Sequence, residues 1–256
     1  MTDENESVLY SVFGARADLI LNRPNKRNAL DDGLINGLKQ GLRQAESDRA
    51  VRVVVVSGAG PDFCSGADLS ALKRISSASV ADNAEDAQSL MELFLIIRNL
   101  RLPVVAAVRG RALAGGCGLA TACDIVLASS PARFGYPEVK IGFVPAMVMA
   151  ILRRNVSEKR AFELLTRGAE ISAAEAERIG IVNQVFNEET FDAEVDSYVG
   201  AFAQVSESAV ALSKKLLYQM DAMAFVEALQ SGADVNVIAR MTDDCQKGIA
   251  HFLKKE

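Results

Sequence analysis

The hydrophobic positions along the chain change their period several times, and each change predicts a new secondary-structure element. Between residues 30 and 42, leucines recur every four positions, which predicts a helix with one buried stripe. Four consecutive valines follow at 53–56, a run typical of a strand buried on both faces of a mostly parallel sheet. Residues 83–100 and 103–110 repeat this order of amphipathic helix and apolar strand. The alternation predicts an α/β core with right-handed crossovers.

The two ends of the chain differ from this alternating middle. Residues 8–24 predict two strands around a turn at Gly14. From about residue 190 onward the pattern is wholly helical, with apolar stripes and no strand signal. We therefore expect two parts: a core over 1–195, and a helical region over 196–256 that packs on the core or on a neighbouring subunit.

The charge balance and the hydropathy argue against two classes of partner. The chain carries 28 basic and 33 acidic residues, a net charge of −5, so we expect no nucleic-acid partner. No apolar run approaches the roughly 18 residues of a membrane span, so we expect no membrane partner. The acidic start MTDENES fits neither a signal peptide nor an Arg-rich transit peptide, which favours a cytoplasmic protein.

The sequence offers few metal-binding or nucleophilic side chains. Its one histidine is His251, near the C-terminus, so a histidine-dependent catalytic triad is disfavoured. The four cysteines show no zinc-site spacing and are expected to be reduced, small apolar residues. We therefore expect no metal site and a reaction that proceeds without imidazole.

The segment ALAGGCGLATACDI at 112–125 holds no catalytic-looking side chain among its glycines. It departs from a P-loop because Gly116 stands where lysine is needed. A glycine pair just before a helix does expose backbone N–H groups that can bind an oxyanion. FCSGADL at 63–69 offers a second such N–H around Gly66 and Ala67, after the previous strand. The two loops can converge on one carbonyl oxygen, although each alone is also an ordinary tight turn.

Five collinear segments carry a resemblance to a known family. They are LNRPNKRNAL (21–30), FCSGADL (63–69), PVVAAVRGRALAGGCGLATACDIVLAS (103–129), ARFGYPEVKIGFVP (132–145) and GAEISAAEAERIGIVNQV (168–185). In order and spacing they resemble the enoyl-CoA hydratase/isomerase (crotonase) family over nearly the whole chain. The resemblance implies a crotonase-like core of repeated ββα turns, a C-terminal helical trimerisation region, and a homo-oligomer that is a trimer or a dimer of trimers.

The resemblance also implies a site for an acyl-CoA thioester. The thioester carbonyl would lie between the backbone N–H groups of Ala67 and Gly115, which match the family's oxyanion-hole positions and would stabilise an enolate. Coenzyme A enters as part of the substrate, so no separate cofactor is expected. The positions that match substrate contacts are Asn28, Ala29, Leu30, Ala67, Asp68, Leu69, Ser70 and Gly115, together with Phe252 and Lys255, which would reach the CoA of a neighbouring subunit.

The catalytic carboxylates depart from the pair that hydratases of this family commonly use. Glu138 matches the glutamate of the FGxPE segment, and its apolar neighbourhood should raise its pKa toward the range useful for proton transfer. The position of the other glutamate falls on Gly118, which cannot exchange a proton. A glutamate introduced there should raise hydration if the pocket has the family's geometry, whereas a loss of folding would show that the start of the helix cannot hold the side chain.

Three functions are compatible with a single carboxylate. We expect an enoyl-CoA hydratase, a hydro-lyase that adds water to 2-enoyl-CoA. The glycine at 118 together with EVxIGxxPA resembles hydratases of branched or carboxylated enoyl-CoA. Glu138 alone also suffices for the conversion of 3-enoyl-CoA to 2-enoyl-CoA, because the proton leaves and returns on one face. The third alternative is a relative that binds acyl-CoA without chemistry.

Overall fold

The computed structural model describes residues 6–66, 73 and 77–254. Its largest sheet has six strands in the order β1-β2-β3-β4-β6-β9, with β1 antiparallel to β2 and the other neighbours parallel. The strands are β1 (Val8–Phe13), β2 (Arg16–Leu21), β3 (Val53–Gly58), β4 (Val104–Val108), β6 (Ile125–Ser129) and β9 (Gln184–Phe186). The parallel strands confirm the predicted α/β core, and β1 with β2 forms the predicted hairpin.

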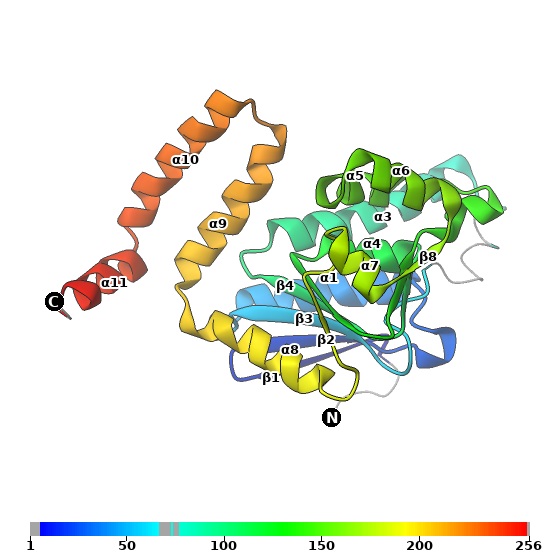
Figure 1. Ribbon diagram of the computed structural model, residues 1–256, viewed down its shortest axis with the longest axis horizontal. Coiled ribbons are helices and arrows are strands. Elements are labelled where there is room, and N and C mark those ends of the chain that lie inside the picture. Colours follow the sequence, from blue (N-terminus) through cyan, green and yellow to red (C-terminus); the bar gives the residue numbers. More distant parts are fainter. Residues whose placement is uncertain (1–5, 67–72, 74–76, 255–256) are drawn as a thin grey trace.

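Helices cover both faces of this sheet (Figure 1). Side chains alternate along β3, so Val54 and Val56 enter the larger apolar core while Val53 and Val55 enter a smaller one. The smaller core is closed by α8 (Phe191–Gly200). The helices of the larger core are α1 (Asp32–Ser47), α3 (Val80–Asn99), α4 (Gly115–Ala122), α5 (Ala146–Asn155), α6 (Glu158–Arg167) and α7 (Ala173–Arg178).

A second sheet of three short strands lies beside the first and was absent from the sequence-based expectations. Its order is β5 (Arg111–Leu113), β7 (Arg133–Gly135), β8 (Glu170–Ser172). β5 and β7 are parallel, with Leu113 opposite Gly135. β5 leads into α4, and β7 leads through Tyr136 into the short helix η2 (Pro137–Ile141). The sheet therefore makes the start of α4 and the start of η2 emerge side by side.

Three helices at the C-terminal end stand beside the core as an arm (Figure 1). They are α9 (Glu207–Gln219), α10 (Phe225–Arg240) and α11 (Asp243–Leu253), joined to α8 through η3 (Ala201–Gln204), with η4 (Met220–Ala222) between α9 and α10. Neither α10 nor α11 has a buried residue. The boundary expected between residues 195 and 196 lies inside α8, whose Val195 and Val199 both pack against the sheet. The division into two domains stays a prediction.

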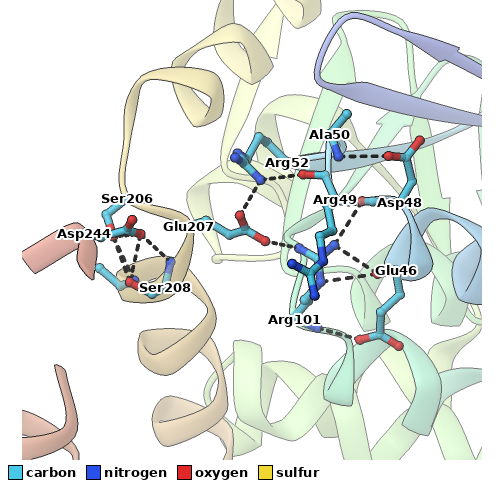
Figure 2. Close-up of polar contacts among 11 residues, drawn as sticks. Glu46, Asp48, Arg49, Ala50, Arg52, Arg101, Ser206, Glu207, Ser208 and Asp244 are labelled. Atoms are coloured by element: carbon cyan, nitrogen blue, oxygen red, sulfur yellow. Dashed lines mark hydrogen bonds and ion pairs between the residues drawn. The ribbon is translucent and has the colours of Figure 1, made fainter. Parts of the chain in front are cut away.

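Charged side chains join the arm to the core (Figure 2). Glu207, in the first turn of α9, forms ion pairs with Arg52 and Arg101 of the core. Asp244 of α11 accepts hydrogen bonds from Ser206 Oγ at 2.7 Å, Ser208 Oγ at 2.8 Å and Ser208 N at 3.1 Å. These donors lower the pKa of Asp244 to about 2. The start of α11 is thereby tied to the start of α9.

Candidate active site

The first turn of α4 supplies the backbone N–H groups of the site. Gly115 is the first residue of this helix, so its N–H belongs to those that have no partner inside the helix. The preceding residue, Ala114, has φ 50° and ψ −128°, a conformation that L-residues rarely adopt. Ala114 is held there because its N–H donates to Gly135 O at 2.8 Å, while Leu113 N donates to Cys64 O at 2.9 Å. The small sheet therefore fixes a strained turn directly before Gly115.

Glycines bring the 63–66 loop against this turn. A Cβ added to Gly116 would lie 2.3 Å from Cys64 O and 2.7 Å from Cys64 Cβ. A Cβ added to Gly66, which has φ +93°, would lie 2.7 Å from Ala114 Cβ. Both contacts are too short for a side chain, so the two backbones approach closely only as glycines. The residue before Ala67 is thus in contact with the residue before Gly115.

Five predicted substrate contacts, one of which is also a predicted catalytic position, cannot be placed any further. Ala67, Asp68, Leu69 and Ser70 lie outside the described residues, as does Lys255. Their roles stay predictions. What the structure adds is the placement of Gly66, the last described residue before them, next to the start of α4.

The segment Asn28–Leu30 is hydrogen-bonded to residues 59–62 and to Gly66. Asn28 is fully buried, and its side-chain amide donates to Ala59 O and Asp62 O while its Oδ1 accepts from Arg23 N. These bonds tie the 23–28 turn to the 59–62 loop, so the side chain of Asn28 has a structural task. The predicted contact of Asn28 with substrate stays a prediction. Because the side chain is used in these hydrogen bonds, such a contact would have to come from the backbone of Asn28.

Leu30 is closer to the first turn of α4. Its N–H donates to Gly66 O at 2.7 Å, and its Cδ1 lies 3.0 Å from the position of a Cβ added to Gly115. Ala29, which is also buried, accepts a hydrogen bond from Arg23 Nη1 at its carbonyl oxygen. Of the three consecutive residues predicted to bind substrate, the structure places Leu30 against both Gly66 and Gly115.

Glu138 lies in the first turn of η2, behind Pro137. Its Oε2 atom is buried and has no hydrogen-bond partner among the described residues. Burial raises the pKa of Glu138, and a hydrogen bond from its own backbone N–H opposes this only in part. The site therefore holds a carboxyl group with one free oxygen and an increased affinity for protons, as the sequence predicted from its apolar neighbours.

Uncharged side chains lie near Glu138, among them Cys117 of α4 and Tyr136, which follows β7. The charge of Glu138 acts on Cys117 and Tyr136, and burial is the largest cause that raises the pKa of both groups, to about 12 for Cys117. Tyr136 is fully buried, and its hydroxyl lies 3.3 Å from Thr121 Oγ1. Both Cys117 and Tyr136 are thus neutral at physiological pH. This neighbourhood could not be predicted from the sequence, because α4 and the segment that follows β7 meet only in the folded chain.

Gly118 lies one turn after Gly115, on the same face of α4. A Cβ added to Gly118 would lie 2.1 Å from Val148 Cγ1 and 3.6 Å from Phe94 Cζ. Val148 comes from α5 and Phe94 from α3. The place of a side chain at 118 is therefore already occupied. Of the two outcomes considered for a glutamate at this position, this contact favours the loss of folding, because Val148 must first move or be shortened.

Phe252 is not brought to this site within one chain. Phe252 lies on α11 and is 68% exposed. In Figure 1, α9 lies between α11 and α4. The predicted contact of Phe252 with the CoA of a neighbouring subunit stays a prediction.

In the described ranges, no group of three or more His, Cys, Asp or Glu side chains is arranged to hold a metal ion. No helix among the described residues has the length and apolarity needed to span a bilayer.

Known proteins resemble this chain over nearly its full length. A Thermus thermophilus protein named "Putative enoyl-CoA hydratase" is 39% identical over 242 residues, which are 94% of this chain and 96% of the relative. The crotonyl-CoA hydratase of Syntrophomonas wolfei is 34% identical, with 98% and 96% covered.

A solved structure and a family model agree with these relatives. The crystal structure of an enoyl-CoA hydratase from Mycobacterium smegmatis superposes with a TM-score of 0.93 at 29% identity, covering 98% of this chain and 97% of that one. The family model described as enoyl-CoA hydratase/isomerase, whose members act on acyl-CoA thioesters, matches residues 15–256. The chain belongs to the enoyl-CoA hydratase/isomerase family.

Proposed function

We propose that this protein is an enoyl-CoA hydratase, which adds water across the double bond of a 2-enoyl-CoA thioester. The observation that carries the proposal is Glu138, a carboxyl group with a buried, unpartnered oxygen and a raised pKa. It follows a strand that runs parallel to the one leading to Gly115. The two crotonase-type elements of the chemistry, a proton carrier and an oxyanion site, therefore come from neighbouring strands.

In the proposed reaction, the thioester oxygen accepts hydrogen bonds from the N–H groups of Gly115 and Ala67. The position of Gly115 at a helix start and the contact of Gly66 with Ala114 support this placement. As the oxygen of water bonds to C3, the carbonyl oxygen gains the charge of an enolate, which the two N–H groups stabilise. Loss of one such donor typically costs about a hundredfold or more in rate.

Glu138 carries the proton in both halves of the addition. The ionised carboxylate takes one proton from water as the hydroxyl group bonds to C3. The resulting carboxylic acid then gives that proton to C2 as the enolate collapses to the thioester, and the carboxylate is restored. Water supplies both added groups, the hydrogen at C2 and the hydroxyl at C3, so no oxidant, reductant or separate cofactor is needed, and CoA belongs to the substrate.

Isomerisation of a 3-enoyl-CoA is the second candidate, and the contact between Gly118 and Val148 favours it. This contact leaves the site without a carboxylate at the position of the family's second glutamate. A single base takes a proton from C2 and returns it to C4, which requires no bound water. Binding of acyl-CoA without turnover is the remaining alternative.

One experiment separates these functions. Purified protein and its Glu138→Gln variant are assayed with crotonyl-CoA and with 3-hexenoyl-CoA, following the absorbance of the conjugated thioester. Loss of absorbance with the first substrate that requires Glu138 supports hydration, whereas a gain with the second and no loss with the first assigns isomerisation. Glu189→Gln, which removes an exposed carboxylate, is the matched control. Turnover of crotonyl-CoA that survives Glu138→Gln contradicts the proposal.

We also propose a homo-oligomer, a trimer or a dimer of trimers, in the cytoplasm, with no nucleic-acid or membrane partner. Exposed apolar side chains on α10 and α11 support self-association. They include Phe225, Val226, Leu229, Val237, Ile249 and Phe252. The unpaired cysteines fit a reducing compartment. Recovery of the protein in an organelle fraction, or its salt-sensitive retention with RNA on a filter, would argue against this assignment.

A further inference from the structure

The glycine at position 118 adds no side chain to this face of α4, which would leave room beside the proposed carbonyl site if no neighbour filled it. The folded chain does not provide that room. An added Cβ would lie 2.1 Å from Val148 Cγ1 and 3.1 Å from Val148 Cβ. The space that glycine leaves on α4 is thus filled by the valine of a different helix.

Val148 is part of the larger apolar core, as are Phe94 and Leu152. Phe94 of α3 lies on the same side, with its Cζ 3.6 Å from the added Cβ, and both side chains are almost completely buried. α5 continues behind Val148 with Leu152, which is fully buried in the same core. Because the interior of a protein is close-packed, the buried side chain of Val148 has little freedom to move aside for a substrate.

Helix geometry places the contact between Gly118 and Val148 next to the proposed carbonyl site at Gly115. Residues three apart lie on one face of a helix, so Gly118 is next to Gly115 along α4. Gly115 is the proposed carbonyl-binding residue, and Leu30 Cδ1 lies 3.0 Å from the position of a Cβ added to it. We take the C2 and C3 atoms of a substrate held at Gly115 to extend along this face of α4, toward Gly118 and Val148.

We propose that Val148 is a specificity-determining residue that restricts the enzyme to 2-enoyl-CoA substrates without a branch at C2 or C3. Its methyl groups occupy the volume into which such a branch would project. The inference rests on the proposed function, since it assumes that the acyl chain binds along this face of α4. It differs from the resemblance to hydratases of branched or carboxylated enoyl-CoA, which Gly118 carries together with EVxIGxxPA.

The test compares a straight and a branched substrate, crotonyl-CoA and 2-methylcrotonyl-CoA, in the full-length protein. In Val148→Ala, we expect the kcat/KM ratio of branched to straight substrate to rise about tenfold or more, the usual effect of a methyl-sized change in an apolar pocket. Val148→Cys shortens the side chain less and should give an intermediate ratio. If Val148→Ala does not fold, Val148→Cys is the variant used for the comparison.

Val156→Ala is the matched control, because Val156 is a similarly buried valine at the end of the same helix. Its ratio should equal that of the wild type. A raised ratio in this control as well, or an unchanged ratio in both Val148 variants, overturns the inference. Refilling the space in the double variant Gly118→Ala/Val148→Ala should return the ratio toward the wild-type value.

A binding measurement separates this inference from the proposed function. Calorimetry with butyryl-CoA and 2-methylbutyryl-CoA, which undergo no hydration, reports the same size limit without chemistry. If the wild type turns over neither enoyl-CoA but Val148→Ala selectively gains affinity for the branched ligand, the hydratase assignment fails and the size limit holds. Equal affinities of the two ligands in wild type and variant overturn the size limit alone.

Discussion

The ammonium group of Lys214 lies 2.7 Å from Oδ2 of Asp124, joining α9 to the core. The same nitrogen donates to Ile97 O and Leu102 O, each at 2.8 Å, so all three of its protons are used. Within Glu207–Gln219, which the structure describes completely, Lys214 is the one buried residue. α9 is therefore anchored by a charge rather than by an apolar stripe, and burial lowers the pKa of that charge.

Lys214→Met should destabilise the protein. The variant leaves the carbonyl groups of Ile97 and Leu102 without this donor and removes the counter-charge of Asp124, and breaking such a buried pair typically costs about 3 to 5 kcal/mol. Urea unfolding at fixed protein concentration measures the loss. Lys215→Met, at the exposed neighbouring position, is the control and should change the free energy of unfolding by less than about 0.5 kcal/mol. Equal stabilities of the two variants would refute the anchoring role.

Gly116→Ala should separate the two loops of the proposed oxyanion site. The new methyl group would lie 2.3 Å from Cys64 O, which is backbone and can move only with the whole 63–66 loop. We expect a loss of about 1–3 kcal/mol in stability and about a hundredfold in kcat. Thermal unfolding and steady-state kinetics measure both. Gly200→Ala, where an added Cβ meets nothing within 4 Å, should keep wild-type activity.

The single variant Gly118→Glu should be destabilised, and a second substitution at Val148 should restore part of the stability and activity. Alone, its side chain would collide with Val148, so we expect a destabilised protein rather than a faster one. Combined with Val148→Gly, the glutamate gains room beside the first turn of α4. Circular dichroism and crotonyl-CoA turnover measure the rescue. A stable, fully active single variant would show that Val148 moves aside easily, contrary to this account.

The pH dependence of the reaction should report Glu138. The hydration step begins with the ionised carboxylate, and burial raises its pKa above the ordinary value of 4.5. The acid limb of kcat/KM against pH is therefore expected above pH 4.5 and to rise with pH. A limb at or below that value contradicts the burial of the reacting carboxyl.

The protonation of Glu138 should also make the stability of the protein depend on pH, in the direction opposite to that of the activity. A raised pKa means that the folded state binds the proton more tightly than the unfolded state does. The stabilisation is complete below the unfolded pKa and is lost as pH rises through the folded pKa. Glu138→Gln should therefore gain stability relative to the wild type at neutral pH, with little difference at pH 4. Unfolding curves at the two pH values measure this.

A charge on the exposed apolar face of α10 should disrupt the oligomer. Leu229 is 59% exposed although it is a large apolar side chain, which is the pattern of a surface that a partner covers. In sedimentation velocity, we expect the wild type to sediment as a trimer or larger and Leu229→Glu to sediment as a smaller species. Gln230→Glu adds the same charge at an adjacent polar position and should sediment like the wild type. A monomeric wild type would contradict the proposal.

Much of the architecture was predictable because its signals are local. The valines at 53–56 and the apolar residues of β4 are buried on both sheet faces, so each run identifies a strand without knowledge of its neighbours. The glycines at 115 and 116 and the glutamate in FGYPE marked the two components of the candidate site, and the family followed from their order. The structure places both components at the ends of parallel strands.

The sequence by itself therefore determined the α/β core, the helical C-terminal region and the chemistry-bearing segments, since each depends on a run of adjacent residues. Only the tertiary structure decided that Val148 fills the space at Gly118 and that Lys214 meets Asp124. It also decided that β5, β7 and β8 form a second sheet. The reason is physical: three-residue strands carry no measurable period, and an empty volume or a buried charge gains its partner from elements far away in the chain.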